Sequence, residues 1–146
     1  MSLTSSAQCK LISFFISFVS IVIGGLLYLS FRPDSLLMFS WAESLGLAKT
    51  VHHLRDKMAF MFTDVPAFVV YSLPNGLWVF SFGVLMIALW GMRQPFHANI
   101  WIAAIVATGI GSELLQITGV IPGTFDMLDV LAYLGGAAFV YLYHAI

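Results

Sequence analysis

The chain has 146 residues, of which 60% are hydrophobic and only 9% are charged, and its formal net charge is −1. A soluble domain carries about 25% charged residues, so this composition excludes an ordinary water-soluble protein and indicates a membrane protein. The near-neutral charge gives no basis for nucleic-acid binding, and one cysteine, Cys9, cannot form a disulfide within the chain. Long, continuous apolar runs favour spanning helices over a β-barrel, whose strands would alternate in polarity.

The first apolar run predicts a spanning helix over residues 11–31. It is uncharged throughout, with Lys10 before it and Arg32-Pro33 after it. A hydrocarbon core about 30 Å thick needs about 20 apolar residues, which this run supplies. A cleaved signal peptide has a shorter apolar core of about 7–15 residues. We therefore expect a retained membrane anchor.

The first loop has a mixed composition and predicts an interfacial segment over residues 36–64. Within it Leu47, Val51, Leu54 and Met58 recur at spacings that place them on one face of a helix. The charged and imidazole side chains lie off this apolar stripe. An amphipathic helix lying at the membrane surface fits the pattern.

The remaining spans are predicted at residues 74–90, 98–118 and 126–146. Pro74 suits the first turn of a helix, which sets the start of the second span. Residues 65–73 are apolar but too short to cross alone, so we expect a re-entrant or interfacial piece. The alternative is one long, Pro-kinked helix from Pro66. The fold class is thus an all-α membrane protein, a single domain with about four transmembrane helices plus an interfacial helix.

Small residues recur every four positions on the last two spans. Small-xxx-small rows let membrane helices approach closely, so we expect them at packing faces. Their partner is either another helix of this chain or a second copy. The rows are Ala103-Ala107-Gly111, Ala104-Thr108-Ser112 and Ala132-Gly136.

Four spans would put both termini on one side of the membrane and all seven acids on the other. Loops rich in Lys and Arg tend to face the cytoplasm. The number of Lys and Arg residues would place the acidic side in the cytoplasm, whereas the short loop that carries Arg93 would place the side of the termini there. We favour cytoplasmic termini. The acids are Asp34, Glu43, Asp56, Asp64, Glu113, Asp126 and Asp129.

Polar residues concentrate where the third predicted span ends and the fourth begins. Glu113 and Gln116 share one helix face, and Asp126 and Asp129 occupy the first turn of the next helix, where the helix dipole favours negative charge. Three interpretations compete: helix capping with local pairing, a polar pocket for a ligand or cation, and a proton relay through Glu113. The candidate ligand-binding residues are Glu113, Gln116, Asp129, Asp126, Asn75 and Arg55.

The same region gives little support for catalysis. Ser112 precedes Glu113 but points about 100° away around a helix, so the pair does not make a nucleophile and its base. Oxygen ligands would suit magnesium or calcium, yet no complete ligand set is visible. We therefore predict no catalytic residue, no metal site and no cofactor, and we favour a protein that is not an enzyme.

The segment Glu113-x-x-Gln116…Pro122-Gly123…Asp129…Gly136 resembles the VanZ-like family of small bacterial membrane proteins. That family places an arginine where this chain has Thr124 and an asparagine where it has Tyr133. Without that arginine, Arg55 or Lys57 would be the substitute counter-ion for the acids. Further upstream, Asp56-Lys57 is similar to a family Asp-Lys pair, but the histidine expected three residues later is Phe60.

The resemblance, strongest over the last 35 residues or so, implies a protein of the bacterial inner membrane and cell envelope. The family's name links it to antibiotic resistance, specifically to teicoplanin, a glycopeptide. We therefore expect binding of an envelope lipid or a glycopeptide-like ligand at the acidic site. The alternatives are a non-catalytic small membrane subunit that oligomerises or joins another membrane protein, and a membrane enzyme or ion pathway using Glu113.

Overall fold

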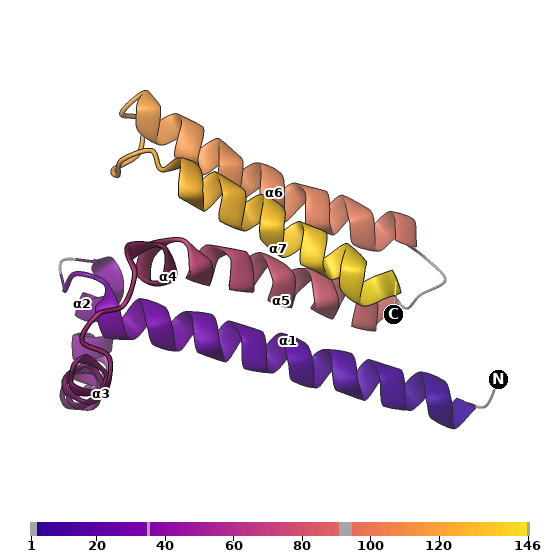
Figure 1. Ribbon diagram of the computed structural model, residues 1–146, viewed down its shortest axis with the longest axis horizontal. Helices are drawn as coiled ribbons and strands as arrows, with labels where there is room; N and C mark the ends of the chain where they lie inside the picture. Colours follow the sequence, from indigo (N-terminus) through magenta and orange to yellow (C-terminus); the bar gives the residue numbers. More distant parts are fainter. Residues whose placement is uncertain (1–2, 35, 91–94, 146) are drawn as a thin grey trace.

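The computed structural model describes residues 3–34, 36–90 and 95–145, and every regular element in that part of the chain is an α-helix. The long helices lie roughly side by side, and the shorter ones gather at one end of the bundle (Figure 1). The elements are α1 (Leu3–Phe31), α2 (Leu37–Ser44), α3 (Ala48–Met61), α4 (Ala67–Tyr71), α5 (Leu73–Trp90), α6 (Pro95–Ile117) and α7 (Met127–Ala145).

Three of the described helices are long and apolar enough to cross a membrane: α1 over Ala7–Phe31, α5, and α6 over Phe96–Ile117. The apolar part of α7, Met127–Tyr143, is shorter. Large apolar side chains on the outside of the bundle, such as Leu11, Phe15, Phe18, Phe96 and Phe139, are mostly exposed. A hydrophobic surface this extensive, on helices long enough to cross a bilayer, indicates a membrane protein.

The helix boundaries differ from the predicted ones in an informative way. α1 begins at Leu3, well before residue 11, because polar residues continue the hydrogen-bonded helix beyond the apolar run. α5 begins at Leu73, one residue before the predicted start. Residues 67–71 form the separate short helix α4, and Ser72 interrupts the helix before α5, so α4 and α5 are not one continuous helix.

α5 occupies the centre of the bundle and packs against α1, α6 and α7. Ser17 on α1 and Ser81 on α5 bind each other reciprocally: each hydroxyl donates to the other residue's carbonyl oxygen, at 2.8 Å in both cases. Nearby, the Trp78 indole lies over Gly24 of α1, where a Cβ atom would be 2.7 Å from the indole nitrogen. These contacts fix α1 antiparallel to α5.

α5 and α7 run parallel and touch through their backbones (Figure 1). Gly76 lies so close to Ala132 that an added Cβ would be 2.9 Å from the Ala132 carbonyl oxygen, and Gly136 packs directly against the carbonyl of Gly76. Further along, Gly83 accommodates the buried Val140 side chain. The Ala132-Gly136 row predicted as a packing face therefore packs inside this chain, against α5.

The start of α1 and the end of α7 lie at one end of the bundle (Figure 1). The other end holds α2, α3, α4 and the turn between α6 and α7. The second end holds all seven acids, as the sequence predicts, and we call it the acidic end. Arg93, on which the predicted orientation depends, lies outside the described residues. The orientation of the bundle in the membrane stays a prediction.

Candidate functional site

Glu113 is the central acid of the site. It lies on α6, one turn before the end of that helix, and only 3% of it is exposed. The Gln116 Nε2 donates to Glu113 Oε1 at 3.4 Å, and the backbone N–H of Asp126 donates to Glu113 Oε2 at 3.1 Å. A buried carboxylate that receives two donors ties the end of α6 to the start of α7.

Asp126 caps α7. Its Oδ1 accepts the backbone N–H of Leu128 at 2.8 Å, and its carbonyl oxygen accepts the N–H of Asp129 at 3.1 Å. An aspartate before the first helical turn commonly satisfies these otherwise unpaired donors. Capping therefore accounts for Asp126 without any ligand.

The turn between the two helices is built around Gly123. Gly123 has φ +138°, a backbone conformation that residues other than glycine rarely adopt. A Cβ added at this position would also lie 2.7 Å from the Gln116 carboxamide carbon. Glycine at this position therefore allows the turn and leaves room for Gln116 to reach Glu113. The Pro122-Gly123 pair in the sequence thus supports the position of the Gln116 amide.

Helix register brings Asp129 opposite Glu113. The Tyr133 ring lies against Gly109, where an added Cβ would be 2.9 Å from three ring atoms. Because α6 and α7 are antiparallel, moving one turn from this contact along each helix places Glu113 and Asp129 at the same level. Both acids lie close enough to act electrostatically on the Tyr133 hydroxyl.

The same level includes residues of α1 and α5. One turn before the Gly76–Ala132 contact come Ser72 and Asp129, since α5 and α7 are parallel. Arg32, just after α1, donates from Nη2 to the Tyr71 carbonyl oxygen at 3.0 Å, and it also acts electrostatically on Tyr133. We call Arg32, Ser72, Glu113, Asp129 and Tyr133 the polar layer.

Several buried polar atoms near this level have no hydrogen-bond partner among the described residues. Ser72 is fully buried (0% exposed) and its hydroxyl is unpartnered. Unsatisfied buried groups are rare in folded proteins, because each costs about 1–3 kcal/mol. This level of the bundle therefore holds polar atoms whose hydrogen bonds are not satisfied within the described part of the chain. The atoms are Ser30 Oγ, Arg32 Nε, Ser72 Oγ and Asp129 Oδ1.

Arg32 was not predicted as a site residue. Its guanidinium lies 5.0 Å from the centres of the Tyr28 and Tyr71 rings, which hold it by cation–π contact. The sequence marks Arg32 only as the charge that ends the first apolar run. Ser72 and Tyr133 were also missed as site residues, although Tyr133 occupies the position at which the VanZ-like pattern has asparagine.

Arg55 lies on α3 and serves a different part of the molecule. Its Nη2 forms an ion pair with Asp34 Oδ1 at 3.1 Å, and its Nη1 donates to the carbonyl oxygens of Leu29 and Arg32 at 2.7 and 2.9 Å. Arg55 thus caps the end of α1, and its polar contacts in the described part of the chain include no acid of the polar layer.

Asn75 is buried in the first turn of α5, 8% exposed, and its Nδ2 donates weakly to the Tyr71 carbonyl oxygen at 3.5 Å. Arg32 donates to the same carbonyl oxygen. Asn75 therefore lies at the edge of the polar layer rather than among its unpartnered atoms.

Over the described residues, no group of three His, Cys, Asp or Glu side chains is placed to hold a metal ion. The chain was also compared with known proteins, and no protein-family model, curated protein or solved structure matches it. The case for a function therefore depends on the polar layer itself.

Proposed function

We propose that this chain is a VanZ-like inner-membrane protein that binds a polar ligand, an envelope lipid or a glycopeptide-like molecule, at the polar layer. In this proposal α7 is the fourth spanning helix, and α2 and α3 lie at the membrane surface. The main support is that Arg32 and Asp129 carry buried, unpartnered atoms at the level of Glu113, of which only 3% is exposed. Intramembrane ionisable groups are costly and are commonly retained for function.

Direct binding to the purified protein tests this proposal. The probes are a bacterial polar lipid extract and teicoplanin, each added to the protein in detergent and followed by native mass spectrometry. Glu113→Gln and Asp129→Asn should weaken binding of the true ligand at least about tenfold, since a hydrogen bond to a charged group contributes about 1.5–3 kcal/mol.

The control is Glu43→Gln, which removes one negative charge from an exposed position at the same end of the molecule. It should bind as the unmodified protein does. If Asp129→Asn and Glu113→Gln fold normally and bind both probes as Glu43→Gln does, the polar layer is not a binding site.

One observation supports a second role, as a subunit of a membrane assembly. On α6 the predicted small-residue row Ala103-Ala107-Gly111 faces outward, with both alanines exposed, and an added Cβ at Gly111 would meet nothing within 4 Å. A close-packing row without a described partner suits a second membrane helix. Gly111→Leu should then shift cross-linked or native-mass species toward monomer; an unchanged distribution would exclude this face.

A further inference from the structure

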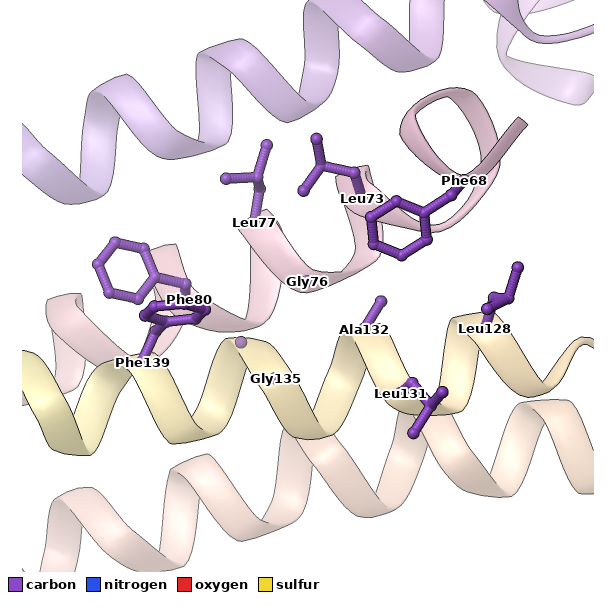
Figure 2. A pocket seen from close by; sticks show the side chains of 11 residues that line it. Phe68, Leu73, Gly76, Leu77, Phe80, Leu128, Leu131, Ala132, Gly135 and Phe139 are labelled. Carbon is purple, nitrogen blue, oxygen red and sulfur yellow. The ribbon is translucent and has the colours of Figure 1, made fainter. Parts of the chain in front are cut away.

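An apolar groove of about 530 Å³ lies between α5 and α7, and it does not lead to the polar layer. Figure 2 shows its walls, with α4 and α5 on one side and α7 on the other. Every described residue that lines it is apolar or a glycine, and no residue of the polar layer is among them. A polar ligand would therefore have to reach the layer by another route.

The polar layer is closed in this structure. The unpartnered atoms of Arg32, Ser72 and Asp129 are buried, so a molecule outside the protein cannot touch them. Ligand binding at the layer consequently requires a movement of the elements around it. Neither α2 nor α3, both of which the structure describes in full, contains a buried residue. Elements with few buried apolar contacts open locally most easily, so these short helices are the candidates.

The end of α1 is covered by short helices. Ile23, Leu26 and Ser30 share one face of α1, which differs from the face of Ser17 and Gly24 that packs against α5. Ile23 and Leu26 are 46% and 40% exposed, whereas Ser30 is 5% exposed. Both α3 and α4 pack against α1. The burial of Ser30 therefore depends on this cover at the acidic end.

Arg55 of α3 fastens the cover. Its Nη1 donates to the carbonyl oxygens of Leu29 and Arg32, at 2.7 and 2.9 Å. These two carbonyls lie on either side of Ser30 in the sequence. Its Nη2 pairs with Asp34 at 3.1 Å. The last carbonyls of a helix have no partner within it, so a guanidinium can bind them. Arg55 thus joins α3 to the turn of α1 that contains Ser30.

Arg32 connects the cover to the polar layer. Its carbonyl oxygen accepts from Arg55, while its guanidinium donates to the Tyr71 carbonyl oxygen at 3.0 Å. The guanidinium also lies against the Tyr28 and Tyr71 rings. The main chain of Arg32 is thus held by α3, and its side chain by α1 and α4. Departure of α3 would therefore loosen a cation of the polar layer and uncover Ser30 together.

We propose that Arg55 and Asp34 form a latch, which keeps α3 closed over the end of α1, and that release of α3 opens the polar layer to its ligand from this side. Arg55 is then a positioning residue, which acts on Arg32 without touching the ligand. The inference rests on the proposed function, because it states how access to the same layer is controlled.

Thiol labelling measures the latch without any ligand. Cys9, the one cysteine of the chain, is exposed and is first replaced by serine. Ser30→Cys then places a single thiol under the cover. The purified full chain in detergent is treated with N-ethylmaleimide, and mass spectrometry follows the labelling rate. Because a buried thiol reacts only when the cover opens, this rate follows the population of the open form.

Arg55→Ala should raise the labelling rate of Ser30→Cys at least tenfold, since loss of a hydrogen bond to a charged group commonly shifts an equilibrium about tenfold or more. Arg55→Lys should restore part of the protection, because lysine can pair with Asp34 but lacks the fork that reaches two carbonyl oxygens. Lys57→Ala is the matched control, which removes an exposed base from the same helix and should leave the rate unchanged. Asp34→Asn should accelerate labelling too, and serves if Arg55→Ala does not fold.

A second reporter separates opening of the cover from loosening of the whole bundle. Ser20 is buried on α1, and its hydroxyl bonds the Ile16 carbonyl oxygen of its own helix. Ser20→Cys should label equally slowly with and without Arg55. Equal acceleration of both reporters by Arg55→Ala would overturn the latch, because Arg55 would then stabilise only the bundle. Rapid labelling of Ser30→Cys with Arg55 intact would overturn it as well.

The two proposals fail separately. If Ser30→Cys labels at the same rate in Arg55→Ala and Lys57→Ala, the latch is wrong, whatever the polar layer binds. If Arg55→Ala accelerates labelling but Glu113→Gln and Asp129→Asn change the binding of no probe, closure by α3 stands and the proposed function fails.

Discussion

The neighbouring glycines Gly135 and Gly136 should respond in opposite ways to the same added methyl group. At Gly136 a Cβ would overlap the carbonyl oxygen of Gly76, and this atom belongs to a helix backbone that cannot rotate away. At Gly135 a Cβ would meet nothing within 4 Å. Both replacements gain about 0.5–1 kcal/mol of helix propensity, because alanine loses less backbone entropy than glycine.

Since both variants share that gain, the difference between their free energies of unfolding measures only the cost of the steric overlap at Gly136. Inserting an atom into a well-packed contact costs about 1–3 kcal/mol, and here it forces α5 and α7 apart. We expect Gly136→Ala to be less stable than Gly135→Ala by about this amount, and Gly135→Ala to be at least as stable as the unmodified protein. The assay is SDS-induced unfolding in mixed micelles, followed by helical circular dichroism.

The comparison is refuted if Gly136→Ala and Gly135→Ala unfold at the same SDS fraction. Gly76→Ala provides an independent check from the opposite helix, because its Cβ would lie 2.9 Å from the Ala132 carbonyl oxygen. It should destabilise as Gly136→Ala does. A stable Gly76→Ala protein would show that α5 and α7 are further apart than this packing requires.

Two further predictions concern polar contacts. In a double-mutant cycle, Ser17→Ala and Ser81→Ala should show a coupling energy of about 0.6 kcal/mol, and no more than about 1.7 kcal/mol, as hydrogen bonds between membrane helices do. Strictly additive effects on SDS-induced unfolding would argue against the reciprocal hydrogen bonds. Asp126→Ala should destabilise by about 1 kcal/mol through loss of the α7 cap, whereas Asp126→Asn should not, because asparagine caps equally well; equal unfolding of the two variants would exclude capping as the role of the carboxylate.

The helices could be predicted from hydropathy, because an apolar segment in lipid must pair all of its backbone groups and a helix does so within the segment. The residues at which the helices begin and end were harder to predict. Hydropathy detects the lipid-contacting part of α1 but not the polar turns from Leu3, which hydrogen-bond equally well. Near Pro74 the competing signals left three outcomes open, and the chain adopts a short α4 followed by α5.

Within the site, the sequence predicted what is local. Glu113 and Gln116 are three residues apart on one helix, and their hydrogen bond follows from that spacing. The capping role of Asp126 follows from its place before an apolar helix. The approach of Asp129 to Glu113 was foreseeable only in part, because it requires the short turn and the antiparallel register together.

Arg32 could not be found in this way, since its place in the site depends on two successive packing contacts. Reciprocal bonding of Ser17 and Ser81 sets the register of α1 on α5, which brings Arg32 to Tyr71. The Gly76–Ala132 contact then sets the register of α5 on α7, which brings Asp129 to the same level. A search of the sequence for a basic residue near the acids considers Arg55 and Lys57 on α3. The structure instead places Arg32 near Tyr133, the residue on which Glu113 and Asp129 also act, although Arg32 is distant from all three in the sequence.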